Sequence, residues 1–97
     1  MPKPKPARPL SDRERALLTY IRAFRVAHDY APGMRQMAQH LDTSTSIINY
    51  HIKRLETRGL LRVPRDEYGA MLAHTVNLTD NAHALLNVRA QTEVAHA

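Results

Sequence analysis

Apolar side chains recur every three or four residues in the first third of the chain, which is the spacing of one helix face. The stripe consists of Leu17, Ile21 and Phe24, with Leu18 and Ala27 on its flank. Ser11 and Glu14 occupy the two positions of a capping box just before it. Pro32 and Gly33 interrupt the pattern afterwards. We therefore expect a helix that is capped by Ser11 and ends near His28.

A shorter apolar pattern follows and predicts a second helix over about residues 34–41. Its inner face is expected to consist of Met34, Met37, Ala38 and Leu41. Residues 42–44, Asp-Thr-Ser, then form a three-residue turn. The hydroxyl of Ser44 is suited to cap a further helix, because serine is among the preferred N-cap residues.

That third helix is expected at roughly Thr45 to Arg58. Apolar residues at i, i+4 and i+7 form its inner face: Ile48, Ile52 and Leu55. Gly59 follows and can take the left-handed conformation that often ends helices. Two short helices joined by a tight turn are typical of a helix-turn-helix.

Beyond Gly59 the apolar spacing falls towards two, which predicts strands at residues 60–64 and 73–78. Residues 65–69 form the expected hairpin tip, and Pro64 limits the first strand to an edge or a short length. The hairpin following a helix-turn-helix is the wing of a winged helix.

A last helix is expected from the Thr79-Asp80 cap to about Arg89, with Ala82, Leu85 and Leu86 buried. The predicted fold is mostly α with a small β-hairpin: a winged helix-turn-helix with a three-helix core, a two-stranded wing and a C-terminal helix. The domain should span residues 11–89, between a disordered, basic, proline-rich arm (1–10) and a flexible tail (90–97).

Composition narrows the class of protein. A chain of 97 residues accommodates one domain, and 14 Lys and Arg against 9 Asp and Glu give a net charge of +5, which suits a polyanionic partner. The absence of cysteine excludes disulfides and thiolate metal sites and fits a reducing compartment. No signal peptide or membrane span is evident, so we expect a cytoplasmic protein, associated with the nucleoid if it is bacterial or from a phage.

The outer face of the third helix has side chains suited to DNA. With the inner positions buried, the solvent side presents Thr45, Ser46, Ile47, Asn49, Tyr50, Lys53 and Arg54. Asn49 suits an adenine edge and Ile47 a thymine methyl group. Hydroxyls and free amides at residues 44–46 favour a phosphate, and Lys53 and Arg54 would hold the backbone further along. The alternative is an ordinary solvated helix face.

Other cations extend the predicted interface. Arg35 lies on the second helix, and Arg62 and Arg65 are the wing's candidates for phosphate or minor-groove contact, with Tyr68 as a companion. Acidic residues at the tip, Asp66 and Glu67, argue against deep insertion, and a hairpin that only covers the core is the alternative. Lys3, Lys5 and Arg8 of the arm either contact DNA or only solubilise the chain.

The stretches LSDRERALLTYIRAF, HDYAPG, MRQMAQHL and NYHIKRLETRGLL, within residues 10–61, resemble the N-terminal winged-helix domain of the LexA family of bacterial repressors. The resemblance covers about half of the chain and implies a winged helix that binds DNA. It also implies that the third helix is the recognition helix and that residues at its N-terminal half contact bases: Ser44, Ser46, Ile47, Asn49 and Tyr50. The wing and LTDNAHALL resemble MarR-type regulators more weakly.

The sequence departs from the LexA pattern at several positions. Asp29 and Asp42 stand where the family usually has glycine, and aspartate tolerates the left-handed conformation that those turns require. Gly33 replaces a better capping serine. The given sequence ends before the family's self-cleaving Ser-Lys protease domain, so we expect no self-cleavage from these residues.

These observations predict a sequence-specific regulator of transcription, a repressor, that binds double-stranded DNA. The alternatives are a winged helix that binds another protein, and an accessory protein of replication or partition. A homodimer would pair through the last helix, which carries Leu85, Leu86, Val88 and Val94.

No catalytic site is predicted, because the carboxylates are dispersed and no serine has the context of a nucleophile. The histidines show no i, i+4 pair, so no metal site is expected, and we predict no cofactor or small-molecule ligand. His51, beside the recognition face, is expected to pack or to contact a phosphate.

Overall fold

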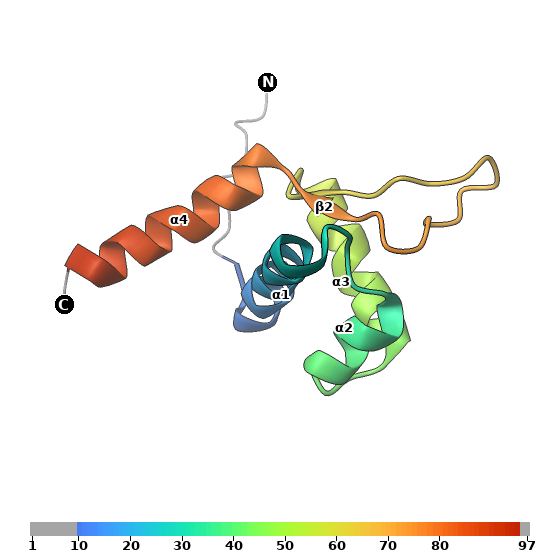
Figure 1. The fold of residues 1–97 in the computed structure, drawn as a ribbon, viewed down its shortest axis with the longest axis horizontal. Coiled ribbons are helices and arrows are strands. Elements are labelled where there is room, and N and C mark those ends of the chain that lie inside the picture. The colour runs from blue at the N-terminus through green and yellow to red at the C-terminus, as the bar shows by residue number, and fades with distance from the viewer. Residues whose placement is uncertain (1–9, 96–97) are drawn as a thin grey trace, which may run out of the picture.

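The structure, a computed structural model, describes residues 10–95, with side chains to residue 87. In chain order, the elements are α1 (Asp12–His28), α2 (Met34–His40), α3 (Thr45–Thr57), β1 (Leu61–Arg62), β2 (Asn77–Leu78) and α4 (Asp80–Ala95) (Figure 1). The fold is the predicted winged helix-turn-helix. Lys3, Lys5 and Arg8 of the expected arm lie outside the described residues.

Both ends of α1 follow from local sequence. The Ser11 hydroxyl accepts a hydrogen bond from the Glu14 amide, and the Glu14 carboxylate accepts one from the Ser11 amide, each at 3.1 Å. This is the predicted capping box, and it satisfies two amides that the helix leaves unpaired. Asp29 ends the helix in the left-handed conformation, with φ 63°.

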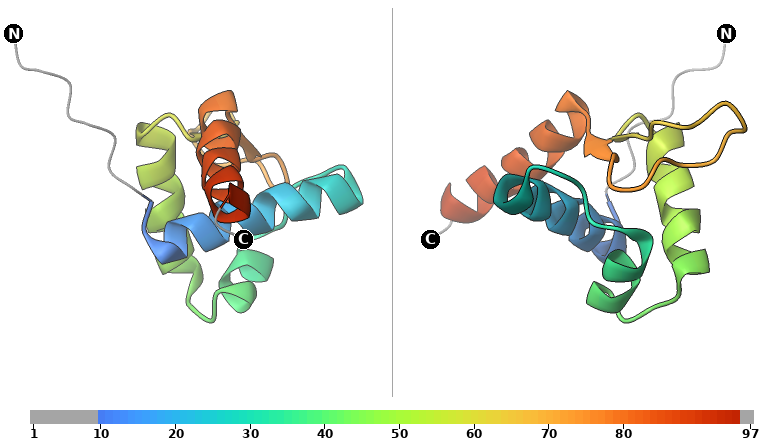
Figure 2. Two further views of the ribbon diagram at one scale, coloured as in Figure 1. Left: turned by 90° about the vertical axis from the view of Figure 1, so that its left-hand side faces the viewer. Right: turned by 45° about the vertical axis from the view of Figure 1, so that its right-hand side comes forward.

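The buried face of α1 differs from the one that the sequence predicts. Leu17, Leu18 and Ile21 are completely buried, whereas Phe24 is only half-buried and Ala27 is exposed. The reason is that α1 lies between other elements. It contacts α2 as well as β2 and α4, and Figures 1 and 2 show it between α3 and α4. Leu18 is therefore a core residue and not a flanking one.

The core joins all four helices to the base of the wing. The three predicted inner positions of α3, Ile48, Ile52 and Leu55, are completely buried, and Met37 and Ala38 of α2 pack with them. Leu60, Leu61, Val76 and Leu78 bring the wing's base into the same cluster. Burial of apolar surface is the main driving force for folding, so α3 is held firmly along its inner side.

The wing has less strand than predicted. Leu61 pairs with Leu78 and Arg62 with Asn77 in an antiparallel register, and nearer the tip an isolated antiparallel bridge joins Arg65 to Met71. Pro64 has no amide to donate, which limits the first strand. The expected strand at 73–78 is interrupted at His74, whose φ is 61°.

His74 instead joins the wing to the loop after α1. Its carbonyl accepts a hydrogen bond from the Ala31 amide at 3.1 Å, and its ring nitrogen Nδ1 lies 2.8 Å from the Ala31 carbonyl. The Tyr30 ring also packs edge-on against it. At His74 the hairpin therefore pairs with this loop where the sequence predicted pairing with the first strand, whereas Met71 and Leu72 still pair with Arg65 and Pro64.

The last helix, α4, differs most from the expected length. It continues to Ala95, past the expected end near Arg89, so residues 90–95 are helical and not an unstructured tail. This stretch contains neither glycine nor proline, and its Ala, Gln and Glu residues are good helix formers. At its start the Thr79 hydroxyl accepts from the Ala82 amide at 3.3 Å and donates to the Gly59 carbonyl at 2.7 Å.

Four histidines of the described chain, His28, His40, His51 and His74, lie against aromatic rings. His40 stacks on Tyr20 at 4.0 Å between ring centroids, and His28 lies 4.3 Å from Phe24. Among residues 10–95, no three or more His, Cys, Asp or Glu side chains form a group that could hold a metal ion. In the same range, no helix has the length and hydropathy needed to cross a membrane.

Candidate nucleic-acid interface

The recognition helix α3 is anchored at both ends by its own sequence. The Ser44 hydroxyl accepts from the Ile47 amide at 3.2 Å, which is the predicted N-cap. At the other end, the Gly59 amide donates to the Glu56 carbonyl and the Leu60 amide to the Leu55 carbonyl, at 3.0 and 2.9 Å. With Gly59 at φ 75°, these bonds form a Schellman motif.

The opposite face of α3 is open to solvent. Every residue predicted for DNA contact on this helix is exposed: Thr45, Ser46, Ile47, Asn49, Tyr50, Lys53 and Arg54. Two of them are large apolar or aromatic side chains, with Ile47 39% and Tyr50 54% exposed. Apolar side chains held in water by a rigid helix are available to a partner surface.

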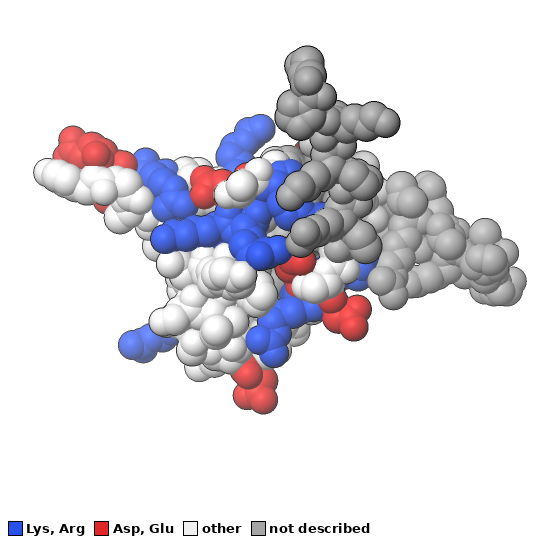
Figure 3. All heavy atoms as spheres, turned by 180° about the vertical axis from the view of Figure 1, so that it is seen from behind, with Lys and Arg blue, Asp and Glu red and all other residues white. Residues whose placement is uncertain are grey.

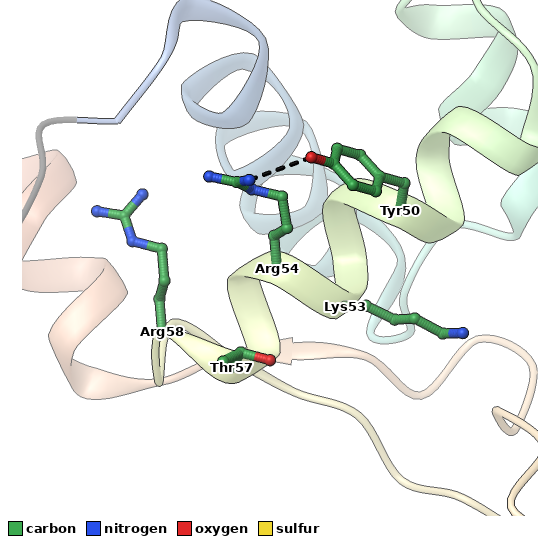
Figure 4. A pocket seen from close by; sticks show the side chains of 5 residues that line it. All are labelled: Tyr50, Lys53, Arg54, Thr57 and Arg58. Carbon is green, nitrogen blue, oxygen red and sulfur yellow. Dashed lines mark hydrogen bonds between the residues drawn. The ribbon is translucent and has the colours of Figure 1, made fainter.

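An open hollow of about 370 Å³ lies along the second half of this face, lined by Tyr50, Lys53, Arg54, Thr57 and Arg58 (Figure 4). The Arg54 guanidinium donates to the Tyr50 hydroxyl at 3.1 Å and lies 5.6 Å from the centre of its ring. Figure 4 shows that Arg54 and Arg58 extend from one side of α3 and Lys53 from the other. The helix thus offers cations to both of its flanks.

Sequence reasoning missed Thr57 and Arg58 in this hollow. A signal was present, because residues 50, 54 and 58 are spaced four apart and therefore share one helix face. Arg58 was assigned to the end of the helix and not to its surface.

Arg58 is also where the recognition helix meets the start of α1. Its Nη1 atom lies 3.5 Å from Oε2 of Glu14, a carboxylate that is only 5% exposed. Burial by itself raises the pKa of Glu14, but hydrogen bonds from Ser11 and the charges of Arg58 and Arg54 outweigh it, so the pKa lies below its usual value. The charged carboxylate therefore fixes the end of α3 against α1.

His51 belongs to the inner side of this junction. Its ring is partly buried, and Nδ1 has no hydrogen-bond partner among the described residues. Burial lowers the pKa of His51, and the charges of Arg13 and Arg54 lower it further against the opposing effect of Glu14. Of the two predicted roles, packing is the one the geometry favours, with the Tyr50 ring 5.5 Å away.

The two arginines that were predicted to contact DNA from the wing have different surroundings. The side chain of Arg62 is exposed on β1 and forms no ion pair or hydrogen bond with the described residues. Arg65 is engaged within the protein: its Nη2 atom lies 2.8 Å from Glu56 of α3, and its Nη1 atom donates to the Gly69 carbonyl at 3.2 Å. The structure thus brings Arg65 to the end of the recognition helix, a contact that sequence reasoning did not predict.

Basic side chains gather on one face of the molecule. Figure 3 shows Lys and Arg over the centre of this face, with smaller acidic spots among and around them. Arg35, the predicted contact on α2, is exposed as well.

The match with a known family is decisive. The model of the LexA DNA binding domain covers residues 7–67, from before α1 into the wing. This chain belongs to the LexA DNA-binding domain family.

The LexA repressor of Corynebacterium efficiens is 38% identical over 80 residues, which are 81% of this chain and 34% of that protein. The LexA repressor of Corynebacterium glutamicum (strain ATCC 13032) is 43% identical over 61 residues, which are 62% of this chain and 26% of that protein. The matched part is thus at most 34% of either relative.

Solved structures extend the likeness beyond the LexA-matched segment. A point mutant of Staphylococcus aureus MepR has a TM-score of 0.65 at 17% identity, and the match covers 91% of this chain and 66% of that one. A MarR-family regulator from Silicibacter pomeroyi has a TM-score of 0.59 at 18% identity, over 80% of this chain and 48% of its own. Identities this low show the winged-helix fold alone.

Within the LexA-family segment, the two aspartates at the family's glycine positions behave as predicted. Asp29 has φ 63° and Asp42 has φ 54°, so both are left-handed. Gly33 has no side chain to cap the amides of α2, but the side-chain oxygen of Gln36 accepts from the Gly33 amide at 2.7 Å, which is the other half of a capping box. The loop after α1 and the turn between α2 and α3 therefore form with aspartate in the left-handed positions.

Proposed function

We propose that this LexA-family domain binds double-stranded DNA at specific sequences and represses transcription there, with α3 in the major groove. The observation that carries the proposal is the contrast between the two sides of α3. Ile48, Ile52 and Leu55 are completely buried, while the opposite side carries exposed hydrogen-bonding and cationic residues. A helix held this firmly can present its outer face to a groove without losing order.

The roles divide along the helix. Asn49 has the amide that pairs with an adenine edge, and Ile47 has the exposed apolar surface that meets a thymine methyl group. Ser44, Ser46 and Tyr50, nearby on the same front half, complete the proposed base-reading set. The Ser44 oxygen accepts from its own helix, so its hydroxyl proton is still free for a phosphate oxygen.

We propose phosphate contacts from cations on the second half of α3 and on the elements next to it. Lys53 and Arg54 flank the second half of α3, Arg35 lies on α2, and Arg62 extends from the wing. Such contacts set position and affinity and carry no sequence information. A protein of the same fold is known to bind DNA: another mutant of Staphylococcus aureus MepR, with a TM-score of 0.63 to this chain at 17% identity, was solved bound to an oligodeoxyribonucleotide.

Selection of bound duplexes from a random library tests the proposal. We expect a defined motif, and affinity that falls steeply as salt rises. If the protein is a homodimer, the motif contains two half-sites about 10 to 10.5 base pairs apart. Binding that shows neither sequence preference nor salt dependence contradicts the proposal and favours a winged helix that binds another protein. If this proposal holds, we expect the protein in the cytoplasm, with the chromosome.

A further inference from the structure

The tip of the wing is more ordered by polar contacts than its short strands suggest. One carboxylate oxygen of Asp66 accepts hydrogen bonds from the amides of Tyr68 and Ala70, both at 2.9 Å. The Asp66 amide donates to the Ala70 carbonyl at 2.9 Å, and the Gly69 amide donates to the Asp66 carbonyl at 3.0 Å. The tip is therefore a closed turn, and the charge of Asp66 is used to build it.

A single guanidinium connects this turn to the recognition helix. Arg65 donates from Nη1 to the Gly69 carbonyl and from Nη2 to the Glu56 carboxylate of α3, at 3.2 and 2.8 Å. Arg65 and Glu56 are each about a third exposed, at 31% and 35% of their side chains. The planar fork of arginine suits two fixed acceptors, whereas the single ammonium of lysine does not.

From this geometry we infer that Arg65 is a positioning residue that holds the wing tip at a set distance from the recognition helix. The inference rests on the proposed DNA binding and deepens it. With Arg65 occupied, contact with DNA falls to Arg62 on β1 and to Tyr68, which is 87% exposed at the tip. The wing tip and α3 then meet the DNA at a set spacing, because the contact that spans them is internal to the protein.

A substitution of Glu56 distinguishes a positioning role of Arg65 from a direct contact of Arg65 with phosphate, because the two roles predict opposite changes in DNA affinity. If Arg65 binds phosphate directly, Glu56 is a nearby negative charge that repels DNA, and Glu56→Gln tightens binding. If Arg65 positions the wing, Glu56→Gln releases the tip and weakens binding. The expected loss is about two- to fivefold, which is the range of a surface ion pair.

Glu67→Gln is the matched control. It likewise removes one negative charge, but from an exposed side chain of the wing tip that forms no hydrogen bond or ion pair with the described residues. We expect this variant to bind DNA as well as the unchanged protein or slightly better. Affinities are compared at one salt concentration on the selected duplex.

A double-mutant cycle separates the two explanations further. If Arg65 acts through Glu56, the double variant Glu56→Gln with Arg65→Ala has the same affinity for DNA as Arg65→Ala alone. If instead Arg65 binds phosphate and Glu56 repels it, the two substitutions have independent effects of opposite sign, and the double variant binds DNA more tightly than Arg65→Ala alone. Tighter binding by Glu56→Gln, or additive effects in the cycle, overturns the inference.

A measurement without DNA keeps the inference testable if no duplex is bound. Backbone order parameters of residues 66–70, from ¹⁵N relaxation of the free protein, should fall in Glu56→Gln and stay unchanged in Glu67→Gln. Unchanged order parameters in both variants overturn the inference even if the protein binds DNA. Failure of the unchanged protein to bind any duplex would reject only the proposed function.

Discussion

The recognition helix and the wing make up the two halves of the proposed DNA surface, and different forces hold them in place. Along α3, three large side chains are completely buried, and both ends are capped by hydrogen bonds within the helix. The wing has two residues in each strand, and its tip depends on a few polar contacts. Its exposed side chains include Tyr68 at 87% and Leu72 at 42%.

The difference indicates which half can adapt. Apolar burial spreads stabilisation over many contacts, so the order of α3 does not depend on any single hydrogen bond. Each polar contact of the wing contributes little by itself, and a segment with few buried contacts opens locally at low cost. We therefore expect mutations in the core of α3 to unfold the domain, and mutations in the exposed tip of the wing to change DNA binding with little effect on stability.

The largest effect should come from the buried side of α3. Ile52→Ala leaves a cavity beside Ile48 and Leu55 and should lower the free energy of unfolding by about 2–5 kcal/mol. Tyr68→Ala in the wing should change it by less than about 0.5 kcal/mol. Urea denaturation followed by circular dichroism measures both. Similar losses for the two variants would mean that the wing contributes to the cooperative core.

Substitutions on the outer side of α3 should reduce DNA binding and leave stability unchanged. Asn49→Ala should cost about 1–3 kcal/mol of binding on the preferred duplex and relax specificity at one base pair, with unfolding unchanged. Lys53→Ala should weaken binding to all duplexes and lower the salt slope by about one. Titrations on preferred and random DNA at several salt concentrations separate the two. Equal losses on both DNAs from Asn49→Ala argue against base reading by this residue.

The two left-handed glycines offer a smaller, matched comparison. Gly59 has φ 75° at the end of α3 and Gly69 has φ 84° at the wing tip, and an added Cβ would meet no atom within 4 Å at either position. Alanine at Gly59 should cost about 1–2 kcal/mol of stability through backbone strain alone. Alanine at Gly69 should cost less, because the tip can open without unfolding the core. A larger loss at Gly69, measured by thermal and urea unfolding, would contradict the proposed weakness of the wing.

The smallest effect concerns pH at the junction of α1 and α3. The folded pKa of His51 lies below its usual value of 6.5, so the unfolded chain takes up the proton first, and stability should fall as the pH drops below that value. The folded pKa of Glu14 is also lowered, so its contribution is present above 4.5 and is lost as the pH falls through the folded pKa.

Substitution tests each half of this pH dependence. His51→Gln should reduce the loss of stability between about pH 7 and 5, and Glu14→Gln should reduce the loss below pH 4.5. Urea unfolding at a series of pH values provides the measurement. A His51→Gln curve that parallels the unchanged protein above about pH 5 would assign the upper transition to another group.

The parts of the site that could be predicted are those specified by neighbouring residues. The Ser44 cap, the inner face of α3 and the Gly59 end depend on spacings within one helix, and together they determine which side of α3 faces solvent. The left-handed aspartates are predictable for the same reason, because a turn's backbone preference is local. Arg65 could not be placed in this way, since its partner Glu56 lies nine residues earlier on another element.

The amino-acid sequence alone therefore determined the helix-turn-helix, its exposed face and its family, because helical periodicity and capping act over three or four residues. Three-dimensional packing decided the rest: the burial of Leu18 between neighbouring elements, the pairing of His74 with Ala31, the meeting of Arg58 with Glu14, and the attachment of the wing tip to α3. These contacts join residues that are far apart in the chain or on different elements. They form only when the folded core brings those residues together, and no local pattern encodes them.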